Sequence, residues 1–194
     1  MSPTQAQRRE ATTTALLDAA RDLFAEDGYA TTSLDAVATK ADVTKGAVYH
    51  HYDGKRQLFE AVFTREVEEL TAGLAAAYAR NSDPWKALEA GCRAFLEACL
   101  EPALQQIVLL DALAALGWER VRRHEQGLLA AIERAIQRAI DAGRIAPRPP
   151  APLASFLFGA LCEMAMVVAR ADNPRVAERQ AVAELSRIMD SLSA

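Results

Sequence analysis

The side chains best suited to bind another molecule fall within residues 31–59, where two short helices are predicted on either side of a tight turn. Ser33 suits the N-cap of the first helix, and Thr44 suits the N-cap of the second, which covers residues 45–51. Residues 41–43 form the turn. This pattern is typical of a helix-turn-helix, whose second helix enters the major groove of DNA while the first lies across the backbone.

The outward side chains of the second helix suit contact with DNA. Thr44 and Lys45 lie at its N-terminal end, where free N–H groups and the helix dipole favour a phosphate. The next two residues, glycine and alanine, leave no bulk, so the helix can approach base edges closely. Tyr49 and His50 can donate hydrogen bonds to phosphates or bases. A helical hairpin buried in a core is the alternative, but these polar side chains would make a poor buried face.

Five pieces of sequence extend the pattern over roughly the first third of the chain. They are A-x-x-L-F-A-E-x-G-Y at 20–29, T-T-S at 31–33, V-A-x-x-A-x-V at 37–43, T-K-G-A-V-Y-H-H-Y at 44–52 and D-G-K-R-Q-L-F at 53–59. In this combination and spacing, the stretch from Leu16 to Phe63 resembles the DNA-binding domain of the TetR family of transcriptional regulators. The remainder resembles that family only in length and helical character.

The resemblance implies roles for individual residues. Some side chains would contact phosphate, and others would lie nearest the base edges, where Ala47 could touch a thymine methyl group. Lys40 is either a phosphate contact or a solvated charge. The expected phosphate contacts are Thr32, Ser33, Lys45, Tyr49 and Lys55. The residues expected nearest the bases are Thr44, Gly46, Ala47 and His50.

Composition predicts an all-α fold. Just over half of the 194 residues are hydrophobic (51%), and alanine and leucine outnumber the β-branched residues. The net charge of −4 does not favour nucleic acid, but DNA binding needs only a local positive face. Residues 40–56 supply such a face, and Arg8 and Arg9 are expected to form a basic N-terminal arm.

Helix signals divide the chain into two expected domains, a helix-turn-helix domain at 1–54 and a helical effector-binding and dimerisation domain at 55–194. A first helix is predicted to end at Gly28, and a long helix begins near Lys55 and links the two domains. Further helices are predicted from Asp83 onward, and residues 146–152 are predicted to be a stiff linker. The last two helices are expected at about 153–171 and 175–192.

The three cysteines lack metal-ligand spacing, and their odd number fits a reducing compartment. They are interpreted as small buried hydrophobes, and no metal or cofactor is expected. The N-terminus lacks the apolar core of a signal peptide. Glu163 interrupts the most apolar stretch, residues 151–169, so no membrane span is expected. These observations predict a cytoplasmic protein.

A ligand pocket is expected between helices of the second domain, where apolar surfaces and a few polar groups converge. Asp111 and Glu163 each interrupt an apolar run, so each lies at the surface, pairs with an arginine, faces a ligand or lies at a dimer seam. If they face a ligand, it would be hydrophobic and either cationic or a hydrogen-bond donor. Plain core is the alternative for the apolar candidates. The candidate pocket residues are Phe95, Cys99, Val108, Asp111, Trp118, Phe158, Cys162, Glu163 and Met166.

The last two helices are expected to pair with their symmetry mates as a four-helix dimer interface. The candidate interface residues are Leu157, Leu161, Val182, Leu185, Ile188 and Met189.

Together these features predict a homodimer that binds a palindromic operator in double-stranded DNA and is released by a small, largely hydrophobic effector. Repression rather than activation is implied by the resemblance alone. No Ser-His-Asp or Cys-His arrangement, phosphate loop or metal spacing suggests an enzyme. The alternatives are a helical ligand carrier and a regulator that needs no effector.

Overall fold

The structure is a computed structural model that describes residues 4–193, and within that range the chain is helical and contains no strand. The chain divides into two compact units. Unit 1 comprises the residues up to Glu66 together with Pro102–Trp118, and unit 2 comprises Val67–Glu101 together with the residues from Glu119 onward. The predicted functional division at residue 54 follows a different criterion and stays a prediction.

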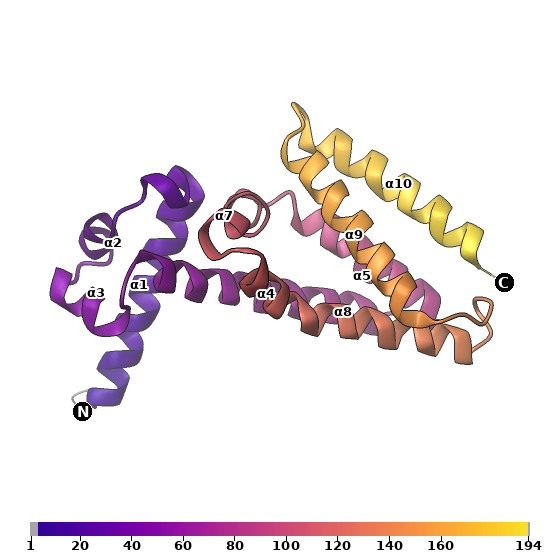
Figure 1. Cartoon of the computed structure of the whole chain (residues 1–194), viewed down its shortest axis with the longest axis horizontal. Coiled ribbons are helices and arrows are strands. Elements are labelled where there is room, and N and C mark those ends of the chain that lie inside the picture. Colours follow the sequence, from indigo (N-terminus) through magenta and orange to yellow (C-terminus); the bar gives the residue numbers. More distant parts are fainter. Residues whose placement is uncertain (1–3, 194) are drawn as a thin grey trace. The chain divides into compact units, whose positions relative to one another are not determined.

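Unit 1 combines the N-terminal helices with a short segment from later in the chain (Figure 1). Its elements are α1 (Gln5–Thr31), α2 (Leu34–Lys40), α3 (Lys45–His51), the first part of α4 (Lys55–Ala79), α6 (Pro102–Leu104), the π-helix η1 (Gln105–Asp111) and α7 (Ala112–Leu116).

Local chemistry fixes the ends of the first three helices. Gly28 breaks the regular path of α1 because its φ of 76° lies in the left-handed region that favours glycine. The side chain of Ser33 accepts a hydrogen bond from the Ala36 N–H, and that of Thr44 accepts one from the Ala47 N–H. Both predicted N-caps are therefore confirmed, and with them the helix-turn-helix.

An aromatic cluster lies at the centre of unit 1. Phe24 and Phe59 are fully buried and meet edge to face, with ring centroids 5.0 Å apart. Tyr29 packs edge to face on Phe59 at 4.9 Å. In the same unit, the Arg21 Nε donates to the buried carboxylate of Glu66 at 2.6 Å. Because a buried carboxylate needs a partner, this pair fixes α4 against α1.

The π-helix η1 packs against α1 within the same unit. The Tyr29 N–H, freed by the turn at Gly28, donates to Asp111 Oδ2 at 2.7 Å, and Gln106 Nε2 donates to the same oxygen at 3.0 Å. Residues 105–116 are not one regular α-helix, because the chain forms a wider π turn at η1 and then α7. In this wider turn, the Asp111 carboxylate accepts the hydrogen bond from Tyr29 that completes the end of α1.

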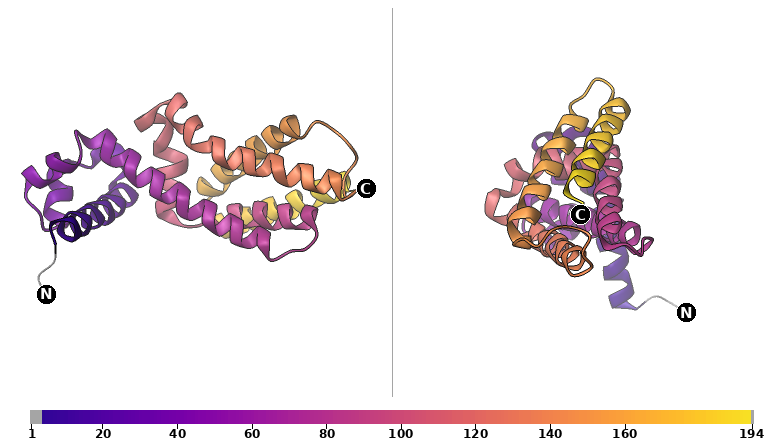
Figure 2. Two further views of the ribbon diagram at one scale, coloured as in Figure 1. Left: turned by 90° about the horizontal axis from the view of Figure 1, so that it is seen from below. Right: turned by 90° about the vertical axis from the view of Figure 1, so that its right-hand side faces the viewer.

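Unit 2 is a bundle of long helices, in which α9 and α10 run side by side as an antiparallel pair (Figure 2). Its elements are the remainder of α4, α5 (Pro84–Ala98), α8 (Trp118–Asp141), α9 (Pro150–Ala169) and α10 (Pro174–Leu192). The predicted linker at 146–152 is wrong in its second half, because α9 already begins at Pro150. Proline is tolerated there because the N–H of the first helical position has no acceptor within the helix, so proline, which lacks an N–H, loses no hydrogen bond.

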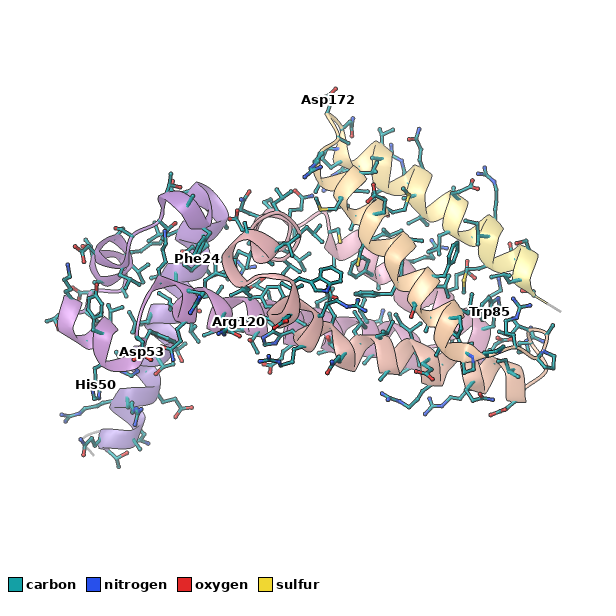
Figure 3. All side chains as sticks on the ribbon, viewed as in Figure 1. Phe24, His50, Asp53, Trp85, Arg120 and Asp172 are labelled. Carbon is teal, nitrogen blue, oxygen red and sulfur yellow. The ribbon has the colours of Figure 1, made fainter. Side chains whose placement is uncertain are left out.

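Hydrogen bonds of two buried α5 side chains, Trp85 and Glu89, hold α5 against α10. Trp85 is buried and its indole N–H donates to the Met189 carbonyl at 3.0 Å (Figure 3). Nearby, the buried carboxylate of Glu89 accepts from Ser186 Oγ at 2.8 Å and from Lys86 Nζ at 3.0 Å. These contacts satisfy the polar groups that this part of the bundle buries.

The three cysteines are free thiols within unit 2: Cys92 and Cys99 are buried, and Cys162 is half-buried. Burial raises the pKa of each thiol to about 12. Because the thiolate is the reactive form, burial makes these thiols less reactive than an exposed cysteine at neutral pH.

By length and apolar composition alone, α9 is capable of crossing a membrane. Core helices of globular proteins meet the same criteria. Here one side of α9 packs inside unit 2, and its other side exposes Phe156 and Val167. The feature to explain is therefore an apolar helix with one uncovered side.

Candidate nucleic-acid interface and ligand cavity

The helix α3 buries one residue and presents most of the others to solvent. Val48 is fully buried in unit 1, whereas Tyr49 is 50% exposed. Ala47 is half-buried between these extremes. The other outward residues are exposed, and Figure 3 shows His50 on the outside of this unit. They are Thr44, Lys45, Gly46 and His50.

Lys45 on this face has an intramolecular partner. Its Nζ lies 2.8 Å from Asp35 Oδ1 of α2, and both side chains are mostly exposed. The hydrogen bond and charge of Asp35 raise the pKa of the Lys45 ammonium above its ordinary value. The ammonium is therefore charged at neutral pH, but a phosphate must compete with Asp35 for it.

The structure corrects the role expected of Thr32. Its side chain is buried, and its hydroxyl donates to the backbone carbonyls of Gly28 at 2.8 Å and Leu23 at 3.1 Å. A hydroxyl committed to the end of α1 is not available to a phosphate. Ser33, by contrast, is exposed at the start of α2.

Lys55 is a structural residue as well as a candidate contact. Its Nζ donates to the carbonyls of Tyr29 at 2.7 Å and Ala30 at 3.0 Å. The same ammonium lies 4.6 Å from the centroid of the Tyr29 ring. The first turn of α4 is thus tied to the end of α1, which leaves Lys55 at most one further N–H for a phosphate.

The remaining basic candidates lie on α1 and α2. Lys40 is 3.1 Å from Asp22 Oδ2 in an exposed ion pair, so it remains either a solvated charge or a phosphate contact. Arg8 and Arg9 are exposed in the first turns of α1. The expected basic arm is therefore wrong, because these two arginines belong to a regular helix capped by Thr4.

One contact near α3 was not predicted. His51 Nδ1 lies 3.1 Å from Thr13 Oγ1 of α1, and burial, followed by the charges of His50 and Arg9, lowers the pKa of His51. His51 is therefore neutral at neutral pH and fixes α3 against α1. The sequence predicted His50 as an outward residue, but it did not predict the contact of His51 with α1.

Unit 2 contains a largely apolar cavity of about 270 Å³ between α4, α5, α8 and α9. Leu74, Leu88 and Leu128 are among its apolar walls. The polar side chains at its edge are Thr71, Tyr78, Arg134 and Arg138, and no carboxylate lines it.

Two of the predicted pocket residues, Phe95 and Phe158, line this cavity. Another two, Cys99 and Cys162, lie in unit 2 outside its lining, as does Met166. Val108 and Trp118 belong to unit 1, and Trp118 is 64% exposed. The predicted pocket residues thus share two of the four helices that line the cavity, α5 and α9, but include none on α4 and none of the α8 lining, where many of the residues are alanine or arginine. The ligand site itself stays a prediction.

The two carboxylates expected to face a ligand lie elsewhere. Asp111 accepts the Tyr29 N–H within unit 1, and Glu163 is exposed on α9. The expectation of a cationic or hydrogen-bond-donating ligand rested on these two residues. The cavity, edged by two arginines, gives that expectation no support.

Most of the predicted dimer residues lie inside unit 2. Four of them are buried, so their side chains cannot contact a second copy directly: Leu157, Leu161, Leu185 and Met189. Val182 is half-buried, and Ile188 is 41% exposed. The pattern identified the apolar helices correctly but assigned their inner face to the outside. The exposed large apolar residues of the pair are Phe156, Val167, Val176 and Ile188.

Among residues 4–193, no group of three or more His, Cys, Asp or Glu side chains is arranged to hold a metal ion.

Comparisons with known proteins cover both units. The family described as bacterial regulatory proteins, tetR family, matches residues 16–62. The family described as the tetracyclin repressor-like C-terminal domain matches residues 85–192, which is more than half of the chain.

A solved structure of a TetR-family transcriptional regulator from Pectobacterium atrosepticum is 35% identical to this chain. It superposes with a TM-score of 0.86 over 99% of this chain and 98% of its own. The TetC protein of transposon Tn10 from Escherichia coli is 29% identical over 119 residues, which are 61% of this chain and 60% of TetC.

The transcriptional activator FasR of Mycolicibacterium smegmatis is 34% identical over 82 residues, which are 42% of this chain but only 37% of FasR. The matches to TetC and FasR thus span less than two thirds of those two relatives. Proteins of this group regulate transcription through a DNA-binding helix-turn-helix and are not enzymes. The chain belongs to the TetR family of transcriptional regulators.

Proposed function

We propose that this regulator represses transcription as a homodimer that binds a palindromic operator and leaves it when a small, largely hydrophobic effector binds in unit 2. The observation that carries the DNA part is the face of α3, where Val48 anchors the helix and Lys45, Tyr49 and His50 remain exposed. A cytoplasmic location follows from the need to reach bacterial DNA.

The uncovered side of the α9–α10 pair supports the dimer. Exposed apolar residues recur on both helices, and two of them, Phe156 and Ile188, are 66% and 41% exposed. A second copy related by a two-fold axis would cover them as a four-helix arrangement. Such a dimer reads successive major grooves if its two recognition helices lie about 34–36 Å apart, hence the palindrome.

The cavity of about 270 Å³ in unit 2 supports the effector. An effector acts by its differential affinity for the DNA-bound and free states, with a typical coupling of ~1–3 kcal/mol. The helix α4 belongs to both units and lines the cavity with Thr71 and Tyr78, so it is the element through which the coupling would act.

The test is a fluorescence-anisotropy titration against the DNA upstream of the regulator's own gene, at two salt concentrations and with a scrambled duplex. We expect tighter binding to the palindrome than to the scrambled DNA. Lys45→Ala should weaken binding to both and reduce the salt slope by ~0.9, the contribution of one phosphate.

Arg123→Ala is the matched control, since Arg123 is an exposed cation on α8 of unit 2. It removes the same charge and should leave affinity and slope unchanged. Equal, weak binding to both duplexes would contradict the proposal, and an unchanged slope for Lys45→Ala would remove that residue from the interface.

A further inference from the structure

The charged groups at the edge of the unit 2 cavity are two cations, Arg134 and Arg138, and no anionic side chain lines the cavity. Arg134 and Arg138 are exposed, and neither forms an ion pair within the described part of the chain. They are four residues apart on α8, so they project from the same face about 6 Å apart along the helix axis. Two unpaired guanidinium groups therefore adjoin one apolar chamber.

Two hydroxyl groups, those of Thr71 and Tyr78, also line the cavity, and they differ in whether they can donate to a ligand. Thr71 Oγ1 already donates its proton to the Val67 carbonyl at 2.7 Å. Tyr78 is half-buried and lines the cavity, and its hydroxyl makes no hydrogen bond to the residues described here, so its proton is available. The donors that can meet a ligand head group are thus Tyr78 and the two arginines. No carboxylate lines the cavity to oppose an anion.

The size and walls of the cavity define the rest of the ligand. An engineered apolar cavity of ~150 Å³ holds benzene, so a chamber of about 270 Å³ has room for roughly ten non-hydrogen atoms. Its walls come largely from leucine, alanine, isoleucine and phenylalanine side chains. An unbranched chain or a small ring system without polar groups would fill it, while a polar group within it would lose its hydration.

From these observations we infer that the ligand of unit 2 is an anionic amphiphile, with an apolar body of about ten heavy atoms in the chamber and a carboxylate or similar head group bound by Arg134 and Arg138. Guanidinium groups pair with carboxylates through charge-assisted hydrogen bonds. This inference rests on the proposed effector site, but it concerns binding to the protein and is tested without DNA.

The experiment compares three probes with the same ten-carbon chain, decanoate, decanol and decylammonium, by isothermal titration calorimetry below their micellar concentrations. We expect decanoate to bind most tightly and decylammonium most weakly. The Arg134→Gln/Arg138→Gln variant should raise the Kd of decanoate about tenfold and change that of decanol less than twofold. Arg123→Gln, on the same helix but outside the cavity, should change neither.

A second variant tests the chamber without removing any charge. Gly91 lines it from α5, and a Cβ added there would meet the Leu74 carbonyl oxygen at 3.9 Å, an ordinary contact. Gly91→Leu should therefore fill the chamber, retain the helix and abolish binding of both decanoate and decanol. The melting temperature of each variant, read by circular dichroism, shows that it is folded.

Three results would overturn the inference: decylammonium binding as tightly as decanoate, equal loss of decanoate and decanol in the arginine variant, or no binding of any probe. DNA affinity measured on the same preparations keeps this separate from the proposed function. If decanoate binds but does not release the operator, the ligand class stands and the effector role fails. If decanoate binds and operator binding is absent, the DNA part fails instead.

Discussion

At the scale of single residues, the ion pair between Asp35 and Lys45 bears on the proposed contact of Lys45 with DNA. The two side chains are exposed and 2.8 Å apart, and such surface pairs add little to stability. On DNA, however, the carboxylate would both occupy the lysine and repel a nearby phosphate. Asp35 therefore acts against binding wherever Lys45 contacts the backbone.

We expect Asp35→Asn to tighten binding to operator and scrambled DNA alike, by roughly three- to tenfold at low salt, because it frees Lys45 and removes a negative charge. Its melting temperature should change little. Anisotropy titrations over a range of salt concentrations measure the effect.

Asp42→Asn is the matched control for this change. Asp42 is exposed in the turn between α2 and α3, with a φ of 55° that asparagine also tolerates. It removes the same charge without releasing Lys45, so its effect should be smaller. Equal gains in the two variants would mean that general charge, rather than the release of Lys45, explains the result.

At the scale of elements, η1 supplies the hydrogen-bond acceptor that the end of α1 lacks. Gly28 turns the chain, Tyr29 is left with a free N–H, and Asp111 of η1 accepts it. An alanine at position 111 would leave that N–H without its partner. The loss of a partly buried hydrogen bond of this kind typically costs ~1–3 kcal/mol.

Asp111→Ala should therefore lower the free energy of unfolding of unit 1 by about 1–3 kcal/mol, and the Tyr29 amide should exchange hydrogen faster. Asp111→Asn keeps an acceptor oxygen and should cost less. Hydrogen exchange followed by mass spectrometry on peptides covering the end of α1 measures both. Unchanged exchange there in Asp111→Ala would show that η1 does not hold the helix end.

The same elements show what the sequence could and could not predict. The caps at Ser33 and Thr44 were predictable because a cap depends on the chemistry of a few consecutive residues. The partner of Asp111 lies 82 residues away, and no local pattern contains it. The burial of the Thr32 side chain likewise depends on the position of the Leu23 and Gly28 carbonyls near the end of α1.

For the candidate sites too, features set by consecutive residues were predictable and features set by distant residues were not. The exposed face of α3 was predicted because it belongs to one short helix with a recognisable spacing. The cavity was predicted only in part, because four helices contribute to it and an exposed arginine on one of them gives no sequence signal. The inner and outer faces of α9 were exchanged, since a helix that is apolar on most sides has no periodicity to orient it.

At the scale of the whole molecule, the uncovered side of α9 makes the assembly testable. Phe156 and Val167, at 66% and 48% exposed, lie on the outer face together with Glu163, which is also exposed. Leu185 is 9% exposed and faces the interior, so a charge there would disrupt unit 2 rather than separate two copies. The interface must be tested on the outer face.

Phe156→Glu should convert the proposed dimer to a monomer while the monomer stays folded, because the new carboxylate is solvated in the free chain but buried at a two-fold interface. Sedimentation equilibrium gives the mass, and circular dichroism gives the helix content.

Leu113→Glu is the control, since Leu113 is 54% exposed on α7, which belongs to unit 1, whereas the α9–α10 pair belongs to unit 2. Operator affinity should fall at least tenfold in the monomer, since one recognition helix then reads only one half-site. A Phe156→Glu protein that remains dimeric would place the interface elsewhere and leave the exposed side of α9 unexplained.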